Sequence, residues 1–463
     1  MPRAGSRIIG RKSLVLIAVF VTVSLLFVWK TVDVVHAASV VGILPRPLVW
    51  RAVQQPLSAD GQTSLLASFM MQVAPTLTLL SHNIRYSNPL ARTTPGIPAP
   101  DETLPSQQFG EVSWATRRHW IADNLLFQLP DIFVLQEVLH NQLMDVSFLL
   151  GDEYQYIGVG RDDGDKQGEA VPVFWRSERL ELLPEDQGGV GSNGYTHFWL
   201  SDTPEKVGSR GWDAALTRMC THVALRFKAS KGERVAAPYD APIHVFSTHY
   251  DHQGQIARAE SSKLIRRKAD EARKQSKAVT GMEPLIIAAG DLNSPREEDG
   301  WLNFVQGNDG SASANSASLS DLAFRDLQLA LPTRFGLPFA RPKNLTAGKD
   351  DSECTPSSSD GRRGILSSSF GPASSFTDWP PVRDRSPAED RIDFIFVADN
   401  QDVVSPRDRS PCDRQKDAEG SVHPSNEPSW RVKTFGVLPS WSLGEGGWRT
   451  SDHRPVMARL KWE

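Results

Sequence analysis

The chain has 463 residues, enough for a large core and, by length alone, for two or three domains. Its apolar content of 40% and charged content of 23% are ordinary for a globular protein. The net charge of −4 excludes an overall basic field that would indicate a nucleic-acid partner, although it leaves a local basic groove open.

The first thirty positions differ from the rest. An uninterrupted apolar run extends from Leu14 to Trp29. It is preceded by the basic residues Arg3, Arg7, Arg11 and Lys12. As a helix this run spans roughly 24 Å, slightly less than the ~30 Å hydrocarbon core, and Trp29 and Lys30 can extend the fit at the interface. We therefore predict a short basic tail at 1–12, a signal anchor or transmembrane helix at 13–30 and a stalk at 31–74.

A cleaved signal peptide is the alternative to an anchor. The stretch "VVHAAS" at 34–39 offers a cleavage site after the apolar run. The anchored form would be a single-pass membrane protein, and the cleaved form would be secreted. Because basic residues favour the cytoplasmic side, both readings place the bulk of the chain in the lumen or outside the cell.

From Thr76 onward, strand-like runs alternate with amphipathic helices. The predicted helices are 113–129 and 256–278, and the predicted strands are 77–84, 131–138, 171–176, 222–227, 243–250, 285–289, 391–398 and 454–462. This mixture predicts one layered α/β or α+β domain over 75–463. Stretches of low apolar content near 305–320, 345–388 and 401–430 predict loop insertions that pack no core.

Cysteine usage agrees with an oxidising compartment without requiring it. Cys354 and Cys412 lie in loop-like stretches and could pair, whereas Cys220 lies in a strand interior. With three cysteines a complete disulfide framework is excluded. Asn344-Leu345-Thr346 is a sequon for N-glycosylation.

Polar and ionisable side chains recur where the predicted strands begin or end. The positions are Asn83, Glu137, His249 with Asp251, Asp291 with Asn293, Asp393, and Asp452 with His453. Asp and Asn are ordinary turn residues, so a single case means little. Recurrence at six strand termini of one chain is hard to attribute to turns and indicates a shared site.

The order of these motifs resembles that of the endonuclease/exonuclease/phosphatase superfamily, which has the fold of pancreatic deoxyribonuclease. The matching motifs are the Asn83 strand, Gln136-Glu137, Thr248-His249, "GDLN" at 290–293, Ile392-Asp393-Phe394 and Ser451-Asp452-His453. They span about Thr76 to Glu463. The resemblance implies a deoxyribonuclease-like four-layer sandwich, in which helices flank two mixed β-sheets.

The resemblance also implies a metal-dependent reaction. A phosphate ester is an anion that repels a hydroxide nucleophile, so its hydrolysis needs a divalent cation, an activated water and donors for the transition state. Mg²⁺ or Mn²⁺ would suit hard oxygen ligands. By resemblance, Glu137 is the principal metal ligand, Asn83 supports it or the bound water, and Asp452 is a ligand of the same or a second ion.

The remaining motif residues take catalytic roles by the same resemblance. His453 is the general base or a charge-stabilising group, and Asp291 orients the attacking water. Asn293 donates to the phosphoryl oxygens, and His249 donates to the scissile phosphate.

Further positions support these groups. Glu169 matches the acidic position that pairs with His249, and Asp393 matches a second acidic position nearby. Arg218 resembles the arginine that contacts the substrate phosphate. For Asp251 and His252, support of the site and a polar turn before the next helix are equally good readings.

The sequence thus predicts a divalent-metal-dependent phosphoesterase that hydrolyses a phosphodiester or phosphomonoester by activated-water attack. A nuclease acting on DNA or RNA and a lipid phosphoesterase acting on sphingomyelin or phosphoinositides are the alternatives. An inactive binding module is a remote one, because such a module should have lost at least one of Glu137, Asp291, Asn293 and His453. The substrate and the oligomeric state stay open.

The basic residues before Leu14 predict the orientation of the chain in a membrane. We expect a cytoplasmic tail with the 75–463 domain across the membrane. Protease added outside intact vesicles from a cell fractionation should leave the domain protected. Digestion of the domain under those conditions would show the reverse orientation.

Overall fold

The computed structural model describes residues 75–88, 111–228, 240–305, 322–331, 369–372, 374–377, 379, 390–398, 429–439 and 449–463. The chain divides into a unit Met1–Val73 and a unit Ala74–Glu463, and all described residues belong to the second. The predicted tail, anchor and stalk, the sequon and the Cys354–Cys412 pair lie outside the described residues. Within the described part, no helix combines the length and the apolar composition that crossing a membrane requires.

The first sheet has six strands in the order β12-β13-β1-β2-β4-β3. Its strands are β1 Thr76–Asn83, β2 Ile132–Gln136, β3 Tyr154–Ile157, β4 Val173–Arg176, β12 Trp430–Val437 and β13 Val456–Trp462. β1 and β2 run parallel, and every other pair in the sheet is antiparallel.

The second sheet repeats this plan. Its order is β10-β11-β9-β8-β7-β5, with β6 also paired to β7. The strands are β5 Leu180–Leu182, β6 Tyr195–Trp199, β7 Met219–Phe227, β8 Ile243–His249, β9 Leu285–Asp291, β10 Phe324–Asp326 and β11 Asp393–Ala398. β8 and β9 are its parallel pair.

Alternation along each central strand explains the layers. In β9, Leu285, Ile287 and Ala289 join the core between the two sheets, whereas Ile286 and Ala288 join the core beneath the helices. Because both faces of the strand are covered, both sets are apolar, and the sequence shows a continuous hydrophobic run.

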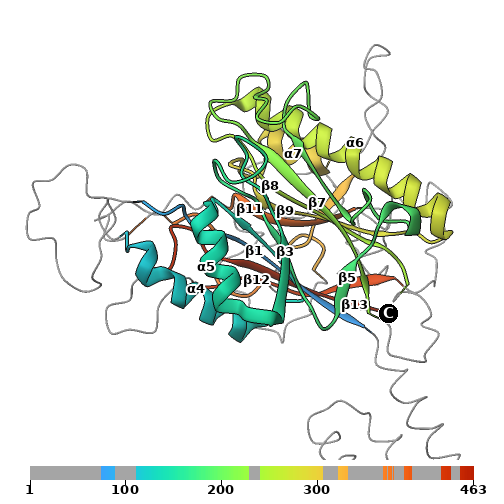
Figure 1. Ribbon diagram of the computed structural model, residues 1–463, viewed down its shortest axis with the longest axis horizontal. Helices are drawn as coiled ribbons and strands as arrows, with labels where there is room; N and C mark the ends of the chain where they lie inside the picture. The colour runs from blue at the N-terminus through green and yellow to red at the C-terminus, as the bar shows by residue number, and fades with distance from the viewer. Residues whose placement is uncertain are drawn as a thin grey trace, which may run out of the picture. The chain divides into compact units, whose positions relative to one another are not determined.

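Helices cover the outer faces of the two sheets (Figure 1). α4 Trp114–Gln128 and α5 His140–Leu150 pack on the first sheet over a core that includes Leu80, Phe133 and Leu135. α6 Gln255–Thr280 and α7 Asp299–Val305 pack on the second over Phe246, Phe394 and Phe396. The short 3-10 helices are Gly151–Glu153 and Glu185–Gln187. The four-layer sandwich expected from the motifs is confirmed.

Part of the predicted 345–388 insertion differs from the expectation that it packs no core. Trp379 is 2% exposed, and the Ser375 hydroxyl accepts the backbone N–H groups of Ile392 and Asp393, each at 3.1 Å. Phe376 forms a β-bridge with His453. Composition missed this contact because only a few residues of a polar segment make it. Trp430, at the end of the predicted 401–430 insertion, begins β12.

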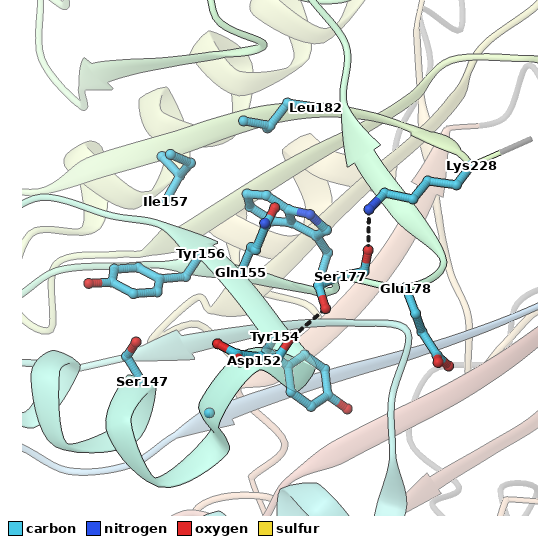
Figure 2. Close-up of a pocket in the computed structure, with 12 residues that line it drawn as sticks. Ser147, Asp152, Tyr154, Gln155, Tyr156, Ile157, Ser177, Glu178, Leu182 and Lys228 are labelled. Carbon is cyan, nitrogen blue, oxygen red and sulfur yellow. Dashed lines mark hydrogen bonds between the residues drawn. The ribbon is translucent and has the colours of Figure 1, made fainter.

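A groove of the described residues lies away from the predicted site residues. Its volume is about 710 Å³, and Figure 2 shows Tyr154, Tyr156, Ser177, Leu182 and Lys228 among its lining. Trp175 also lines the groove and pairs with Ile132, at the start of β2, whereas Glu137 follows the end of that strand. The groove and the predicted site therefore occupy opposite ends of the first sheet.

Candidate active site

Strand register brings the predicted site residues to one end of the sandwich. Asn83 pairs with Gln136 at the ends of the parallel strands β1 and β2, and His249 pairs with Asp291 at the ends of β8 and β9. β11 is antiparallel to β9, so Asp393 at its start lies beside Asp291. β13 is antiparallel to β1 with Ser81 opposite Val456, which puts the preceding Asp452 and His453 level with Asn83.

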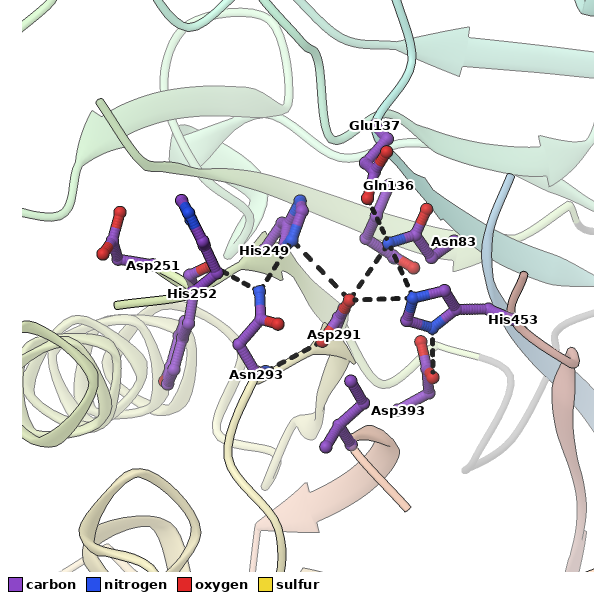
Figure 3. A network of polar contacts seen from close by, with 12 residues as sticks. Asn83, Gln136, Glu137, His249, Asp251, His252, Asp291, Asn293, Asp393 and His453 are labelled. Carbon is purple, nitrogen blue, oxygen red and sulfur yellow. Dashed lines mark hydrogen bonds and ion pairs between the residues drawn. The ribbon is translucent and has the colours of Figure 1, made fainter. Parts of the chain in front are cut away.

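Asp291 is the meeting point of these strand ends (Figure 3). Its Oδ2 accepts a hydrogen bond from Asn83 Nδ2 at 3.0 Å and lies 3.6 Å from His249 Nε2 and 3.7 Å from His453 Nε2. The carboxylate is 1% exposed. Burial, followed by the nearby charge of Asp393, raises the pKa of Asp291 to about 7.

His453 is held by Asp393. His453 Nδ1 and Asp393 Oδ2 are 2.8 Å apart, and both residues are buried. Burial alone would lower the pKa of His453, but the charge of Asp393 and the hydrogen bond to it, with the charges of Asp291 and Asp452, raise that pKa to about 10. The imidazole is therefore a cation at neutral pH. Asp393, predicted only as a second acidic position near Glu169 and His249, thus contacts His453 and lies beside Asp291.

His249 has the opposite charge state. Burial, followed by the charges of Arg218 and Arg161, lowers the pKa of His249 well below its usual value, so the ring is neutral. Asn293 Nδ2 lies 3.0 Å from His249 Nε2 and also donates to the Tyr250 carbonyl at 3.0 Å. The carbonyl fixes the amide orientation, so Nε2 accepts and Nδ1 carries the proton.

Glu169 faces that proton across a small cavity. His249 Nδ1 is 3.8 Å from Glu169 Oε2, and Arg161 holds the same carboxylate with two hydrogen bonds of 2.7 and 3.2 Å. Arg218 Nη1 lies 4.0 Å from Glu169 Oε2. These four residues line a cavity of about 10 Å³, roughly the space of one water molecule. Among the described residues, Arg218 Nη1 and His249 Nδ1 have no hydrogen-bond partner.

Glu137 lies on the other side of Asp291. Its Oε1 accepts from Asn83 Nδ2 at 2.9 Å, and its Oε2 accepts from the Tyr86 backbone N–H at 3.1 Å. Although burial alone would raise the pKa of Glu137, the neighbouring Arg85 and the Asn83 hydrogen bond hold it below its usual value. Arg85 Nε is 3.9 Å from Asp452 Oδ2, so Asp452 belongs to the same group.

Three residues on the Glu137 side are absent from the predicted catalytic and metal-binding residues. Arg85 and the fully buried Glu111 join the Glu137 side, with Arg85 Nε 3.6 Å from Glu111 Oε1. Arg117 is fully buried and donates to the carbonyls of Ile84 at 2.7 Å and Thr450 at 2.8 Å, which fixes the chain before Asp452 against the end of β1. The only sequence signal was their closeness to motif residues or to a helix start.

Asp251 combines the two readings that the sequence left open. It accepts backbone N–H groups from Leu216, Gln253 and Gly254 and so forms the turn that leads into α6. Its Oδ2 also lies 3.7 Å from Arg218 Nε. His252 Nδ1 lies 3.4 Å from Arg218 Nη2. Both residues therefore position Arg218.

Backbone strain concentrates here. Of the described residues other than glycine, six have positive φ, and three of them are Arg85 at 61°, Glu137 at 60° and Asn293 at 45°. Residues in this region persist only where surrounding contacts hold them, and they cluster at functional sites.

The donors present fit a divalent cation. Asp291, Asp393 and His453 offer ligand atoms within 4.8 Å of one another, but the His453 and Asp393 atoms are already hydrogen-bonded together. The Glu137 and Asp452 side offers carboxylate oxygens alone, which Mg²⁺ and Mn²⁺ prefer. The donor chemistry therefore favours the Glu137 side.

Comparisons with known proteins identify the fold. An endonuclease/exonuclease/phosphatase from Bacteroides vulgatus aligns with a TM-score of 0.51 and 24% identity over 84% of this chain and 100% of that one. A family protein from Bacteroides thetaiotaomicron aligns with a TM-score of 0.52 and 24% identity, over 84% of this chain and 99% of that one. A mannosyl-6-phosphatase from the same organism aligns with a TM-score of 0.51 and 25% identity, over 83% of this chain and 99% of that one. No protein-family model and no curated protein sequence matches the chain.

The chain therefore has the fold of the endonuclease/exonuclease/phosphatase proteins, as the motif order predicted. The three alignments extend over nearly the whole length of each solved chain.

The protonation of His453 predicts a pH dependence of stability. The folded chain keeps this proton up to about pH 10, whereas an unfolded histidine releases it near pH 6.5. Within that window the folded state binds the extra proton, so stability falls as pH rises. Denaturant unfolding in metal-free buffer should give a steeper decline for wild type than for His453→Gln. Parallel curves for the two proteins would contradict the assignment.

Proposed function

We propose that the chain is a divalent-metal-dependent phosphoric ester hydrolase. The observation that carries the proposal is the buried Asp291 carboxylate, with Asn83, His249 and His453 around it from different strand ends and the Glu137 carboxylate beside it. A carboxylate poised near neutral pH, a charged imidazole and oxygen ligands are the groups that attack of water on a phosphate ester requires.

The residues divide the work by charge state. A divalent ion held by Glu137, with Asp452 and Asn83 nearby, would neutralise phosphate charge. Asp291, with its pKa of about 7, would orient the attacking water and take its proton. His453 is already protonated at neutral pH, so of its two proposed roles charge stabilisation fits better than general base. Asn293 and His249 lie on the opposite side of Asp291, where the Asn293 amide would exchange its hydrogen bond to His249 Nε2 for one to a phosphoryl oxygen.

For the substrate, we favour a small phosphorylated molecule over a nucleic acid. Arg161 and Arg218 lie beside the site, but Glu169 and Asp251 compensate their charges, which leaves little free positive charge for a polyanion. The likeness to a mannosyl-6-phosphatase also favours a small phosphorylated substrate.

For the N-terminal segment, we propose that residues 13–30 anchor the domain to a membrane or are cleaved to release it.

A substrate panel tests the proposed class. The 75–463 fragment with Mg²⁺ should hydrolyse sugar phosphates or nucleotides faster than single- or double-stranded DNA, RNA, phosphoinositides or sphingomyelin. Preferential hydrolysis of a nucleic acid or a lipid would replace the small-molecule proposal with that alternative. No hydrolysis of any phosphate ester would contradict the enzyme proposal itself.

Substitution of Asp291 separates catalysis from turn formation. Asn serves a turn as well as Asp, so Asp291→Asn should be silent if the residue only ends β9. If Asp291 orients the attacking water, Asp291→Asn should lower kcat by ~10²-fold or more. Its melting temperature should equal or exceed that of wild type, because the change removes a buried carboxylate. The exposed Asp186→Asn is the control and should keep wild-type turnover.

Asn293→Ala tests the donor on the other side of Asp291. It should lower kcat strongly with little change in KM, because in the proposed reaction the amide transfers its hydrogen bond from His249 Nε2 to the phosphoryl oxygens as negative charge grows on them. Steady-state kinetics on the panel substrate would show this split. An increase in KM alone would assign Asn293 to ground-state binding.

Metal dependence is tested at Glu137. EDTA should abolish hydrolysis, and added Mg²⁺ or Mn²⁺ should restore it. Glu137→Gln should lose at least about 10²-fold in kcat/KM, since a metal ligand supplies several kcal/mol of charge stabilisation. Gln keeps one oxygen, which can accept from Asn83 or from the Tyr86 backbone N–H but not from both, and circular dichroism should show that the fold is retained. Full activity in EDTA would refute metal dependence.

A further inference from the structure

Arg85 lies among three buried carboxylates at the end of β1. Its Nε is 3.6 Å from Glu111 Oε1 and 3.9 Å from Asp452 Oδ2, and its Nη1 is 3.6 Å from Glu137 Oε2. The side chain of Glu111 is fully buried, and those of Asp452 and Glu137 are 8% and 12% exposed. One guanidinium is therefore shared by three negative groups that are removed from water.

The local backbone fixes Arg85 in this place. Its φ of 61° is unusual for a residue with a side chain, and its N–H donates to Asn83 Oδ1 at 3.0 Å. Its carbonyl accepts from Gln142 Nε2 at 2.9 Å and from Arg117 Nη2 at 3.3 Å. The guanidinium also packs 4.3 Å from the centre of the Tyr86 ring. Contacts of the backbone N–H, the backbone carbonyl and the side chain therefore fix the position of Arg85 in the site.

Charge balance limits what else can bind here. Among the described residues, the carboxylates of Glu111, Glu137 and Asp452 and the guanidinium groups of Arg85 and the buried Arg117 sum to a charge of about −1 when all are ionised. A single divalent ion would change that charge to about +1. A second ion would leave about +3 in a region with little access to water, where unpaired charge is costly.

The same balance argues against Arg85 as a phosphate-binding group. The guanidinium of Arg85 lies within 4.0 Å of three buried carboxylates, whereas that of Arg218 lies within that distance of two, Glu169 and Asp251, and also borders the small cavity beside His249. Arg85 is thus suited to neutralising carboxylates.

We propose that Arg85 takes the place of a second divalent cation, so that the site holds one metal ion. This inference rests on the proposed metal-dependent function. It decides between the one-ion and two-ion readings of Asp452: Asp452 shares its charge between the single ion and Arg85. Removal of the guanidinium should leave the three carboxylates without its compensating charge, and the space it occupied should then accept a second divalent ion.

Mn²⁺ titration followed by electron paramagnetic resonance, which counts free and bound ions directly, tests the proposal. The 75–463 fragment should bind one Mn²⁺ at saturation, and Arg85→Met should bind two. Arg161→Met is the matched control, because it also removes an arginine of the site and frees a carboxylate, that of Glu169. It should still bind one Mn²⁺. Arg85→Lys, which keeps the charge, should also bind one.

The outcomes separate this inference from the proposed function. Two ions bound to wild type would overturn the inference whether or not Arg85→Met folds, and would leave metal-dependent hydrolysis intact. One ion in both wild type and Arg85→Met would overturn the role of Arg85. Two ions in Arg161→Met as well would show that any freed carboxylate suffices, and would also overturn it. No Mn²⁺ bound to wild type, together with activity in EDTA, would instead refute the proposed function.

Discussion

The cost of burying negative charge determines how this end of the sandwich is built. Glu137, Asp291, Asp393 and Asp452 are all at most 9% exposed, and the two sheets bring them together through the register of their strands. Carboxylates cannot be buried together unless cations, donors or protons compensate them. The surrounding groups supply each of these: guanidinium beside Glu137, imidazolium beside Asp393, and a proton for Asp291 near neutral pH.

The two histidines show how this compensation assigns chemistry. Both rings are buried within 4 Å of the same Asp291 oxygen, and burial alone would lower the pKa of each. The carboxylate of Asp393 contacts His453 directly and reverses the effect, whereas the charges of Arg218 and Arg161 act on His249 and reinforce it. One site thus contains a charged and a neutral imidazole, so it can present a fixed cation on one side and a hydrogen-bonding ring on the other.

The sequence predicted the central strands well because both of their faces are buried. The run Leu285–Ala289 is apolar throughout, and polar residues follow at the point where the strand leaves the core. Strands such as β3, β5 and β10 are only three or four residues long at or near the sheet edges, and give no such pattern. Order along the chain predicted the fold, since each motif marks one strand end.

The charges that balance the motif residues were beyond reach of the same reasoning. Glu111 and Arg117 precede or begin a helix and are separated from Glu137 and Asp452 by long stretches of chain, so only the folded register brings them together. Their residue types are also those of an ordinary exposed helix. A motif identifies groups that act on a substrate. The residues that compensate the charge of those groups when they are buried can be recognised only from their positions in the folded chain. For this reason Arg85, two positions after a motif asparagine, acquires a role only when Glu111, Glu137 and Asp452 are seen around it.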